Sequence, residues 1–194
     1  MAEPRVAGLL LAAGGGRRYG MPKALVELDG RLFVESSAAV LRDGGCGPVV
    51  VVLGARAEDV RGTADLDGYT VVDNPQWTTG MGSSLRVGLS ALPSDVDAVA
   101  VLPVDVPGVT PASVRRVLGQ SAPDALVRAT YAGLPGHPVL IGRAHWSGVY
   151  EAAVADVGAR DYLRSHQVTG IDCSDIGVGV DVDRPEDLPG SPRA

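Results

Sequence analysis

Residues 6–23 have the sequence VAGLLLAAGGGRRYGMPK, in which an apolar run leads directly into a loop of glycines and cations. The run from Val6 to Leu11 is apolar at consecutive positions, which is typical of a strand buried on both faces of a parallel sheet. In open α/β sheets, ligands bind where the carboxyl ends of the strands emerge. This stretch therefore predicts an α/β fold with a phosphate-binding loop after its first strand.

Two familiar glycine motifs do not account for this loop. A P-loop needs Lys and then Ser or Thr after GxxxxG, and Met21 and Pro22 stand at those positions. A dinucleotide fingerprint needs GxGxxG; Gly14 and Gly16 fit it, but Tyr19 replaces the third glycine. The loop needs a different explanation.

The rest of the chain alternates between strand and helix patterns. Apolar runs predict strands over 6–11, 49–53, 70–74, 98–104 and 124–131. Helical spacing predicts helices over 32–45, 56–62, 82–92, 111–119 and near 147–154, with Ser83 or Thr79 near the N-cap of the third. Residues 178–188 predict a closing strand that runs into a helix start, and 189–194 a frayed tail. The order favours a three-layer α/β domain with a mostly parallel sheet.

Length and charge limit the classes of function. At 194 residues the chain is most simply one domain, with a nucleotide-binding half near 1–105 and an acceptor-binding half near 106–188. The net charge of −6 argues against a nucleic-acid partner. No apolar stretch reaches the roughly 18–20 residues of a membrane span. The start lacks a signal-peptide pattern, so we expect a cytoplasmic protein. Cys46 and Cys173 are predicted to be buried thiols.

Charged residues after three predicted strands suggest a site for a small anion. The loop gathers Arg17, Arg18 and Lys23, which can neutralise phosphates. Asp105 follows the strand 98–104, and Asp183 lies in VDVDRPED; both are candidate ligands for a hard cation. The alternatives are a turn or N-cap role for Asp105 and helix capping for Asp183.

Two further segments carry polar groups that could contact a ligand. WTTGMGSSLRVGL, residues 77–89, places Gly80, Ser83 and Ser84 before a helix; N-capping explains one serine, and a ligand wall would explain the others. His137 lies in PGHPV, and a structural role for it is as plausible as a substrate contact. His145 and His166 have no evident partners and are expected at the surface.

The chemistry that these residues allow is phosphate transfer. No nucleophile–base pair and no metalloprotease or esterase motif is present. A phosphate-binding loop with two separated aspartates suits nucleotidyl or phosphoryl transfer, in which positioning and electrostatics do most of the catalysis. Mg²⁺ held by Asp105 and Asp183 would bridge the phosphates. An attacking phosphate is already ionised at neutral pH, so no general base is needed.

Five segments in order resemble the nucleotidyltransferases that attach a nucleotide to molybdopterin. They are LLLAAGGGRRYGMPK (9–23), WTTGMGSSLRVGL (77–89), LPVDVPGVT (102–110), GLPGHPVLI (133–141) and VDVDRPEDL (180–188). The opening LAAG resembles the molybdenum cofactor cytidylyltransferases more than the guanylyltransferases. Tyr19 departs from the family, which usually has Met there.

The resemblance implies a Rossmann-like fold, CTP as the nucleotide and Mg²⁺ as cofactor. By this resemblance Arg17, Lys23 and Asp105 are catalytic, and Asp105 and Asp183 hold the metal. The nucleotide-binding set is Leu11, Ala12, Ala13, Gly14, Gly15, Gly16, Arg17, Arg18, Lys23, Gly80, Ser83, Ser84 and Asp105. The acceptor-binding set, facing the pterin, is Gly136, His137 and Pro138.

Three alternatives to this assignment stay open. The enzyme could use GTP, or another phosphorylated acceptor such as a sugar phosphate or methylerythritol phosphate. The chain could instead be a nucleotide-binding chaperone for the maturation of a molybdoenzyme. The expected partners are small-molecule substrates, namely a nucleoside triphosphate and a phosphorylated pterin. A molybdoenzyme or its maturation factor is a further candidate partner.

Overall fold

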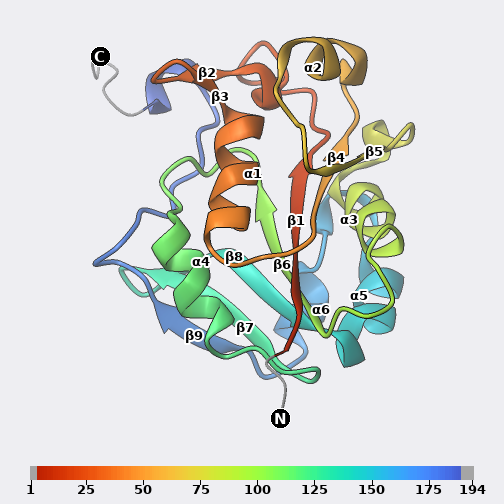
Figure 1. Cartoon of the computed structure of the whole chain (residues 1–194), viewed down its shortest axis with the longest axis vertical. Coiled ribbons are helices and arrows are strands. Elements are labelled where there is room, and N and C mark those ends of the chain that lie inside the picture. The colour runs from red at the N-terminus through yellow and green to blue at the C-terminus, as the bar shows by residue number, and fades with distance from the viewer. Residues whose placement is uncertain (1–3, 189–194) are drawn as a thin grey trace.

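A seven-stranded sheet with helices on both faces forms the molecule, and the computed structural model describes residues 4–188 (Figure 1). The sheet strands are β1 (Val6–Ala12), β4 (Val49–Leu53), β5 (Thr70–Asp73), β6 (Ala98–Pro103), β7 (Leu126–Tyr131), β8 (Leu134–Gly142) and β9 (Thr169–Asp172). Their order is β5-β4-β1-β6-β8-β7-β9. β8 is antiparallel to both its neighbours, and the other pairs are parallel. The predicted mostly parallel α/β sheet is confirmed.

Among the described residues, the five predicted helices are present, and α6 is a helix that the sequence patterns did not predict. They are α1 (Phe33–Asp43), α2 (Ala57–Thr63), α3 (Met81–Ser90), α4 (Pro111–Leu118), α5 (Trp146–Ala152) and α6 (Arg160–Arg164). Short 3-10 helices are η1 (Lys23–Leu25), η2 (Trp77–Thr79), η3 (Arg143–His145), η4 (Ala155–Val157) and η5 (Pro185–Asp187), and a small hairpin joins β2 (Glu27–Leu28) to β3 (Arg31–Leu32). None of the helices within 4–188 is long and apolar enough to cross a membrane.

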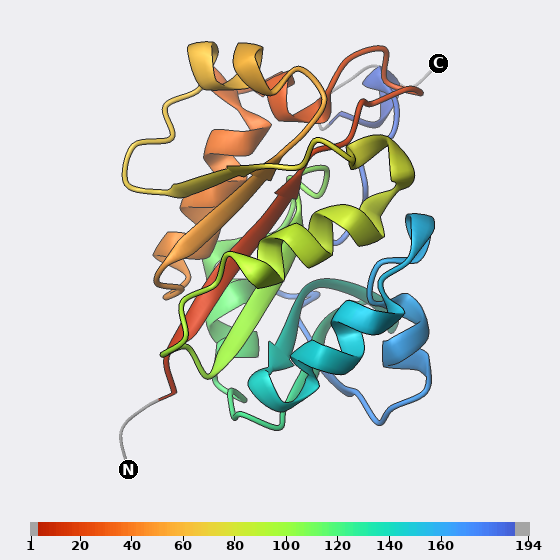
Figure 2. The same cartoon turned by 90° about the vertical axis from the view of Figure 1, so that its right-hand side faces the viewer.

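Helices cover the two faces of the sheet in separate groups. Side chains of α1, α2 and α4 belong to one buried cluster, and those of α3, α5 and α6 belong to the other. Figure 2 shows α3 and α5 in front of the strands, with α1 behind them. The three-layer arrangement follows because β1 and β4 are buried at every residue and must be covered on both faces.

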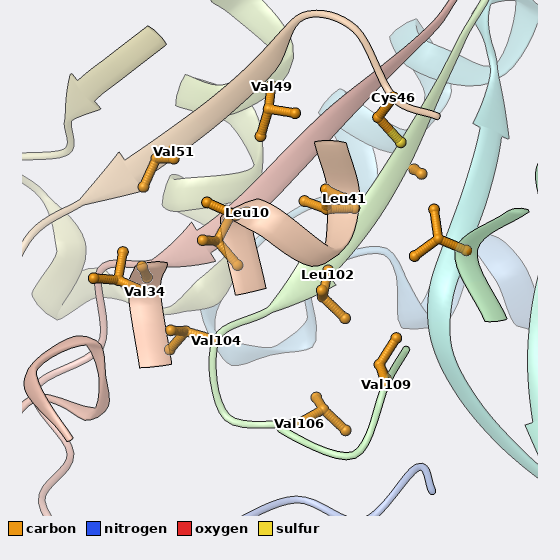
Figure 3. Close-up of a cluster of buried hydrophobic side chains, with 14 of the residues drawn as sticks. Leu10, Val34, Leu41, Cys46, Val49, Val51, Leu102, Val104, Val106 and Val109 are labelled. Carbon is orange, nitrogen blue, oxygen red and sulfur yellow. The ribbon is translucent and has the colours of Figure 1, made fainter. Parts of the chain in front are cut away.

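Figure 3 shows how one face is packed. Val34 and Leu41 of α1 lie over Leu10 of β1 and Leu102 of β6. Cys46 belongs to the same cluster, and both Cys46 and Cys173 are buried free thiols, as the sequence predicted. Burial raises the pKa of the Cys46 thiol to about 12, so this cysteine stays protonated and unreactive.

The predicted strand at 178–183 is wrong. That segment joins no sheet; its backbone makes single hydrogen bonds to the loop after β6, from Val178 N to Gly108 O (2.9 Å) and from Val182 N to Asp105 O (2.8 Å). The segment crosses the end of the sheet and does not pair with an edge strand. Its alternating apolar and polar residues therefore form no strand. The region after 132, irregular in pattern, contains β8, and β9 follows it. The predicted tail, 189–194, lies outside the described residues.

The cap predicted for α3 is also wrong. Gly80, with φ +112°, occupies the N-cap position, and Ser83 lies inside the helix. The hydroxyl of Ser83 donates to carbonyl oxygens of the preceding turn, 2.8 Å from that of Gly80. A side chain at Gly80 would collide with the backbone of Ala155, so close packing by η4 requires a glycine here.

Candidate active site

The loop after β1 owes its shape to its third glycine. Gly16 has φ +60°, and a Cβ there would collide with the carbonyl oxygen of Met21. The amide of Gly20 donates to the carbonyl of Gly16 at 2.8 Å, which folds the loop back on itself. A Cβ on Gly15 would touch the ring of Trp77 at 3.0 Å, so the loop lies against that indole. The glycines thus bring backbone amides to the surface of a site that Trp77 borders.

Lys23 joins the loop to both predicted metal ligands. Its Nζ lies 2.8 Å from Asp105 Oδ2 and 2.8 Å from Asp183 Oδ1, with 13% of its side chain exposed. Arg18 adds a second cation, 2.7 Å from the other oxygen of Asp183. Residues from three distant parts of the sequence therefore meet at one point, at the carboxyl ends of β1 and β6.

The contacts of Lys23 shift the pKa values of the groups involved. Burial lowers the pKa of Lys23, but hydrogen bonds and charges from Asp105 and Asp183 outweigh it and hold the pKa above 10.5. The hydrogen bond from Lys23 lowers the pKa of Asp183, against a smaller opposing effect of burial. Burial and the two neighbouring carboxylates raise the pKa of Asp181. The ammonium and Asp183 are therefore both charged at neutral pH.

Asp183 is placed by packing, not by a strand. Val182 is 2% exposed and belongs to the core cluster beneath α1, a burial that contributes roughly 1.5–3 kcal/mol. The carboxylate of Asp187 accepts hydrogen bonds from the amides of Asp183 (3.1 Å) and Arg184 (2.8 Å), forming a tight turn. Asp187 is therefore the capping residue, and the side chain of Asp183 remains available to Lys23.

The opposite wall is organised by Asn74, which sequence reasoning missed. Asn74 is buried at the end of β5, and its Nδ2 lies 2.8 Å from Ser83 Oγ and 3.0 Å from Ser84 Oγ. Its Oδ1 accepts a hydrogen bond from the amide of Gln76 at 3.0 Å. An asparagine directly after an apolar strand was the signal that could have identified it. The amide fixes both serines, so Ser84 presents a defined position to the cleft.

These elements enclose a cleft of about 540 Å³, within the roughly 300–1,000 Å³ typical of small-molecule sites. Predicted site residues that line it are Leu11, Ala13, Gly14, Gly15, Gly16, Arg17, Arg18, Lys23, Gly80, Ser84, Asp105 and Asp183. Lining residues not singled out as ligands are Trp77, Thr78, Met81, Pro103, Val104 and Asp156. Asp156 reaches the cleft from η4, and no strand end in the sequence marked it.

Five predicted residues do not line the cleft. Ala12 is buried in the sheet, and Ser83 is held behind Ser84. The predicted acceptor residues, Gly136, His137 and Pro138, lie on β8. Burial, together with the charge of Arg128, lowers the pKa of His137 to about 4, so its ring is neutral at pH 7.

The two remaining histidines have partners, contrary to expectation. His145 lies with Nδ1 2.9 Å from the hydroxyl of Tyr162 and Nε2 3.0 Å from the carbonyl of Asp124. His166 is exposed, and its ring stacks on Tyr162 at 3.9 Å between centroids. Both belong to the packing of η3 and α6, away from the cleft.

The class of protein follows from where the charges lie. Cations that can neutralise phosphates face carboxylates that can hold a cation, in one cleft at the ends of parallel strands. Nucleotidyl transfer requires such an arrangement, and the protein is a nucleotidyltransferase. Residues 8–169 match the MobA-like NTP transferase domain family, and the chain belongs to that family.

The names of individual relatives refer to different activities. The chain is 40% identical over 195 residues to the nicotine blue oxidoreductase of Paenarthrobacter nicotinovorans, with 95% of each chain covered. It is 29% identical over 115 residues to a probable molybdenum cofactor guanylyltransferase of Bacillus cytotoxicus, covering 59% of this chain and 56% of that one. The crystal structure of Rv0371c from Mycobacterium tuberculosis H37Rv superimposes with a TM-score of 0.83 at 27% identity, covering 96% of both chains. A manganese complex of Rv0371c matches with a TM-score of 0.74 at 26% identity, covering 95% of this chain and 92% of that one.

Proposed function

We propose that this chain transfers CMP from CTP to the phosphate of molybdopterin and releases pyrophosphate, with Mg²⁺ as cofactor. The observation that carries the proposal is the meeting of Lys23, Asp105 and Asp183 beside the glycine loop. The choice of CTP rests on the LAAG opening of the loop, and the choice of a pterin acceptor on the GLPGHP segment. The relative from Bacillus cytotoxicus, named for molybdenum cofactor, supports the acceptor class.

The reaction needs positioning more than acid–base chemistry. A phosphate oxygen of the acceptor forms a bond to the α-phosphorus of CTP, and the bond from that phosphorus to the pyrophosphate oxygen breaks. Pyrophosphate leaves with the electron pair. The second pKa of a phosphate monoester is about 6, so the attacking oxygen is ionised at neutral pH. Lys23 and Arg17 would neutralise the phosphates, and the loop amides would orient them.

The donor set of the cleft fits a hard divalent cation. Asp105 and Asp183 both reach the same ammonium nitrogen, so their oxygens converge on one point. No group of three or more His, Cys, Asp or Glu within 4–188 is arranged to hold a metal. Mg²⁺ keeps waters and takes phosphate oxygens as ligands, so two carboxylates suffice for it. When bound, it would offset negative charge on the triphosphate.

Asp105→Asn tests the metal assignment. The amide keeps the shape of the side chain but removes the charge, so pyrophosphate release should fall at least about 100-fold. Release is followed with CTP, molybdopterin and Mg²⁺, and the exposed Asp67→Asn serves as the matched control. Turnover in Asp105→Asn equal to that of the control would exclude Asp105 as a ligand.

The same assay separates the alternatives for substrate. GTP in place of CTP, and sugar phosphate or methylerythritol phosphate in place of molybdopterin, test the related transferase reactions. Nucleotide binding without pyrophosphate release from any pair would favour a chaperone for molybdoenzyme maturation.

A second candidate is an oxidoreductase. It is favoured by the 40% identity over 95% of both chains to a protein named nicotine blue oxidoreductase. The test is loss of the colour of nicotine blue with a reduced nicotinamide dinucleotide as the electron donor. Decolorisation without any pyrophosphate release would replace the transferase proposal.

A further inference from the structure

Arg128 on β7 carries a charge that the described residues leave without a partner. Its side chain is half-buried, its Nε is buried, and it makes no hydrogen bond or ion pair with any residue within 4–188. Burial lowers the pKa of Arg128, and no carboxylate of the described residues offsets this effect. A desolvated charge is costly unless it is paired, so this guanidinium has the properties of an anion ligand.

A second buried nitrogen without a hydrogen-bond partner among the described residues lies on the neighbouring strand. His137 is on β8, next to β7 in the sheet, and its Nδ1 is buried with no hydrogen-bond partner among the described residues. Burial lowers the pKa of His137, and so does the charge of Arg128, whereas the charge of Asp105 and a hydrogen bond with the backbone of Val101 raise it.

The register of the sheet places Arg128 on the same face as residues of the cleft. Arg128 lies opposite Val139 in the antiparallel β7–β8 pair, and residues directly opposite each other share a face. Val139 belongs to the core cluster shared with Leu11 and Ala13, both of which line the cleft. Arg128 therefore lies on the same face of the sheet as these two cleft residues.

We propose that Arg128 binds a phosphate group of the acceptor substrate, with His137 as the residue that positions it. This rests on the proposed function. The planar guanidinium can donate two parallel N–H bonds to an oxyanion. The neutral ring of His137 adds a hydrogen bond without adding charge. Lys23 and the loop would then serve the nucleotide, and Arg128 the acceptor, so that two anionic substrates have separate cations.

The test uses inorganic phosphate as a probe of the anion site. Arg17→Gln/Arg18→Gln/Lys23→Met removes all three cations of the nucleotide loop, and in this background phosphate should still raise the melting temperature. Adding Arg128→Gln should abolish that rise, whereas adding Arg160→Gln, an exposed arginine on α6, should leave it unchanged. A phosphate response that persists when Arg128→Gln is added to the triple loop variant would overturn the proposal.

Kinetics distinguish an acceptor role from a general loss of structure. With Arg128→Gln we expect the KM for the acceptor to rise at least tenfold while the thermal shift caused by CTP is unchanged. If Arg128→Gln does not fold, Arg128→Lys keeps the charge but loses the fork, and phosphate should bind several-fold more weakly. Equal phosphate affinity of Arg128→Lys and the wild type would refute the proposal. Absence of pyrophosphate release from the wild type would refute the proposed function without changing the phosphate-binding result.

Discussion

At the scale of single residues, Lys23 is the centre of the site. Its ammonium group bridges two carboxylates that come from the loop after β6 and from the last segment of the described chain. A triphosphate would compete with those carboxylates for the same cation. The exposed Arg17 makes no ion pair within 4–188 and is free to contact phosphates directly.

Lys23→Met should weaken CTP binding by about 10- to 100-fold, because a charge-assisted hydrogen bond contributes roughly 1.5–3 kcal/mol. Isothermal calorimetry with Mg²⁺ and CTP measures the change, and Arg160→Gln is the control for loss of a positive charge. Unchanged affinity in Lys23→Met would contradict a phosphate contact.

His137 should make stability depend on pH. The pKa of His137 is about 4 in the folded protein, below the usual 6.5, so its contribution to the free energy of unfolding is complete above pH 6.5. Between pH 6.5 and about 4 the unfolded chain binds a proton that the folded chain does not. The free energy of unfolding therefore falls by roughly 3 kcal/mol as the pH is lowered through this range. Urea unfolding of the wild type and of His137→Gln across this range measures it. Equal slopes of unfolding free energy in the two proteins would contradict the burial of a neutral ring.

At the scale of elements, the loop after β1 depends on one backbone conformation. Gly16→Ala would place a Cβ where the carbonyl of Met21 lies, at a φ of +60°. We expect it to destabilise the loop by about 1–3 kcal/mol and to weaken nucleotide binding at least tenfold. Gly62→Ala on α2 is the control, because a Cβ there meets no atom within 4 Å and Gly62 does not line the cleft. Thermal unfolding and CTP titration of both variants check this prediction. Equal melting temperatures and equal CTP affinities of the two variants would contradict the requirement for glycine at position 16.

The sequence predicted most elements because their patterns are local. The run VVVVL at 49–53 and the helix beginning at Pro111 appear where the sequence places them, since consecutive apolar residues and a capping Thr110 act over a few positions. The segment 178–183 and the cap of α3 were predicted incorrectly. Both depend on contacts with backbone that is distant in sequence. The segment 178–183 bonds to Gly108 and Asp105, and the start of α3 packs against Ala155.

At the scale of the whole molecule, the cleft joins the beginning, middle and end of the described chain. A nucleotide that contacts the loop, Ser84 and Asp183 together should stabilise the entire fold. At 100 times its dissociation constant, a ligand adds about 2.7 kcal/mol to stability.

Thermal shifts should therefore be larger with CTP and Mg²⁺ than with GTP and Mg²⁺. The Mg²⁺-dependent part of the thermal shift should disappear in Asp183→Asn and persist in Asp67→Asn. A Mg²⁺-dependent shift that survives in Asp183→Asn would separate Asp183 from the metal, and a larger shift with GTP would reverse the nucleotide preference.

The sequence by itself determined the α/β class, the first strand with its phosphate loop, and the candidate residues Lys23, Asp105 and Asp183. These follow from local patterns and from the rule that parallel strands present their carboxyl ends at one edge. Only the tertiary structure decided that Lys23 bridges both aspartates, that Asn74 fixes Ser84, and that Arg128 has no carboxylate partner within 4–188. Those relations join residues far apart in the chain, and burial and packing between elements set them, which no short-range pattern encodes.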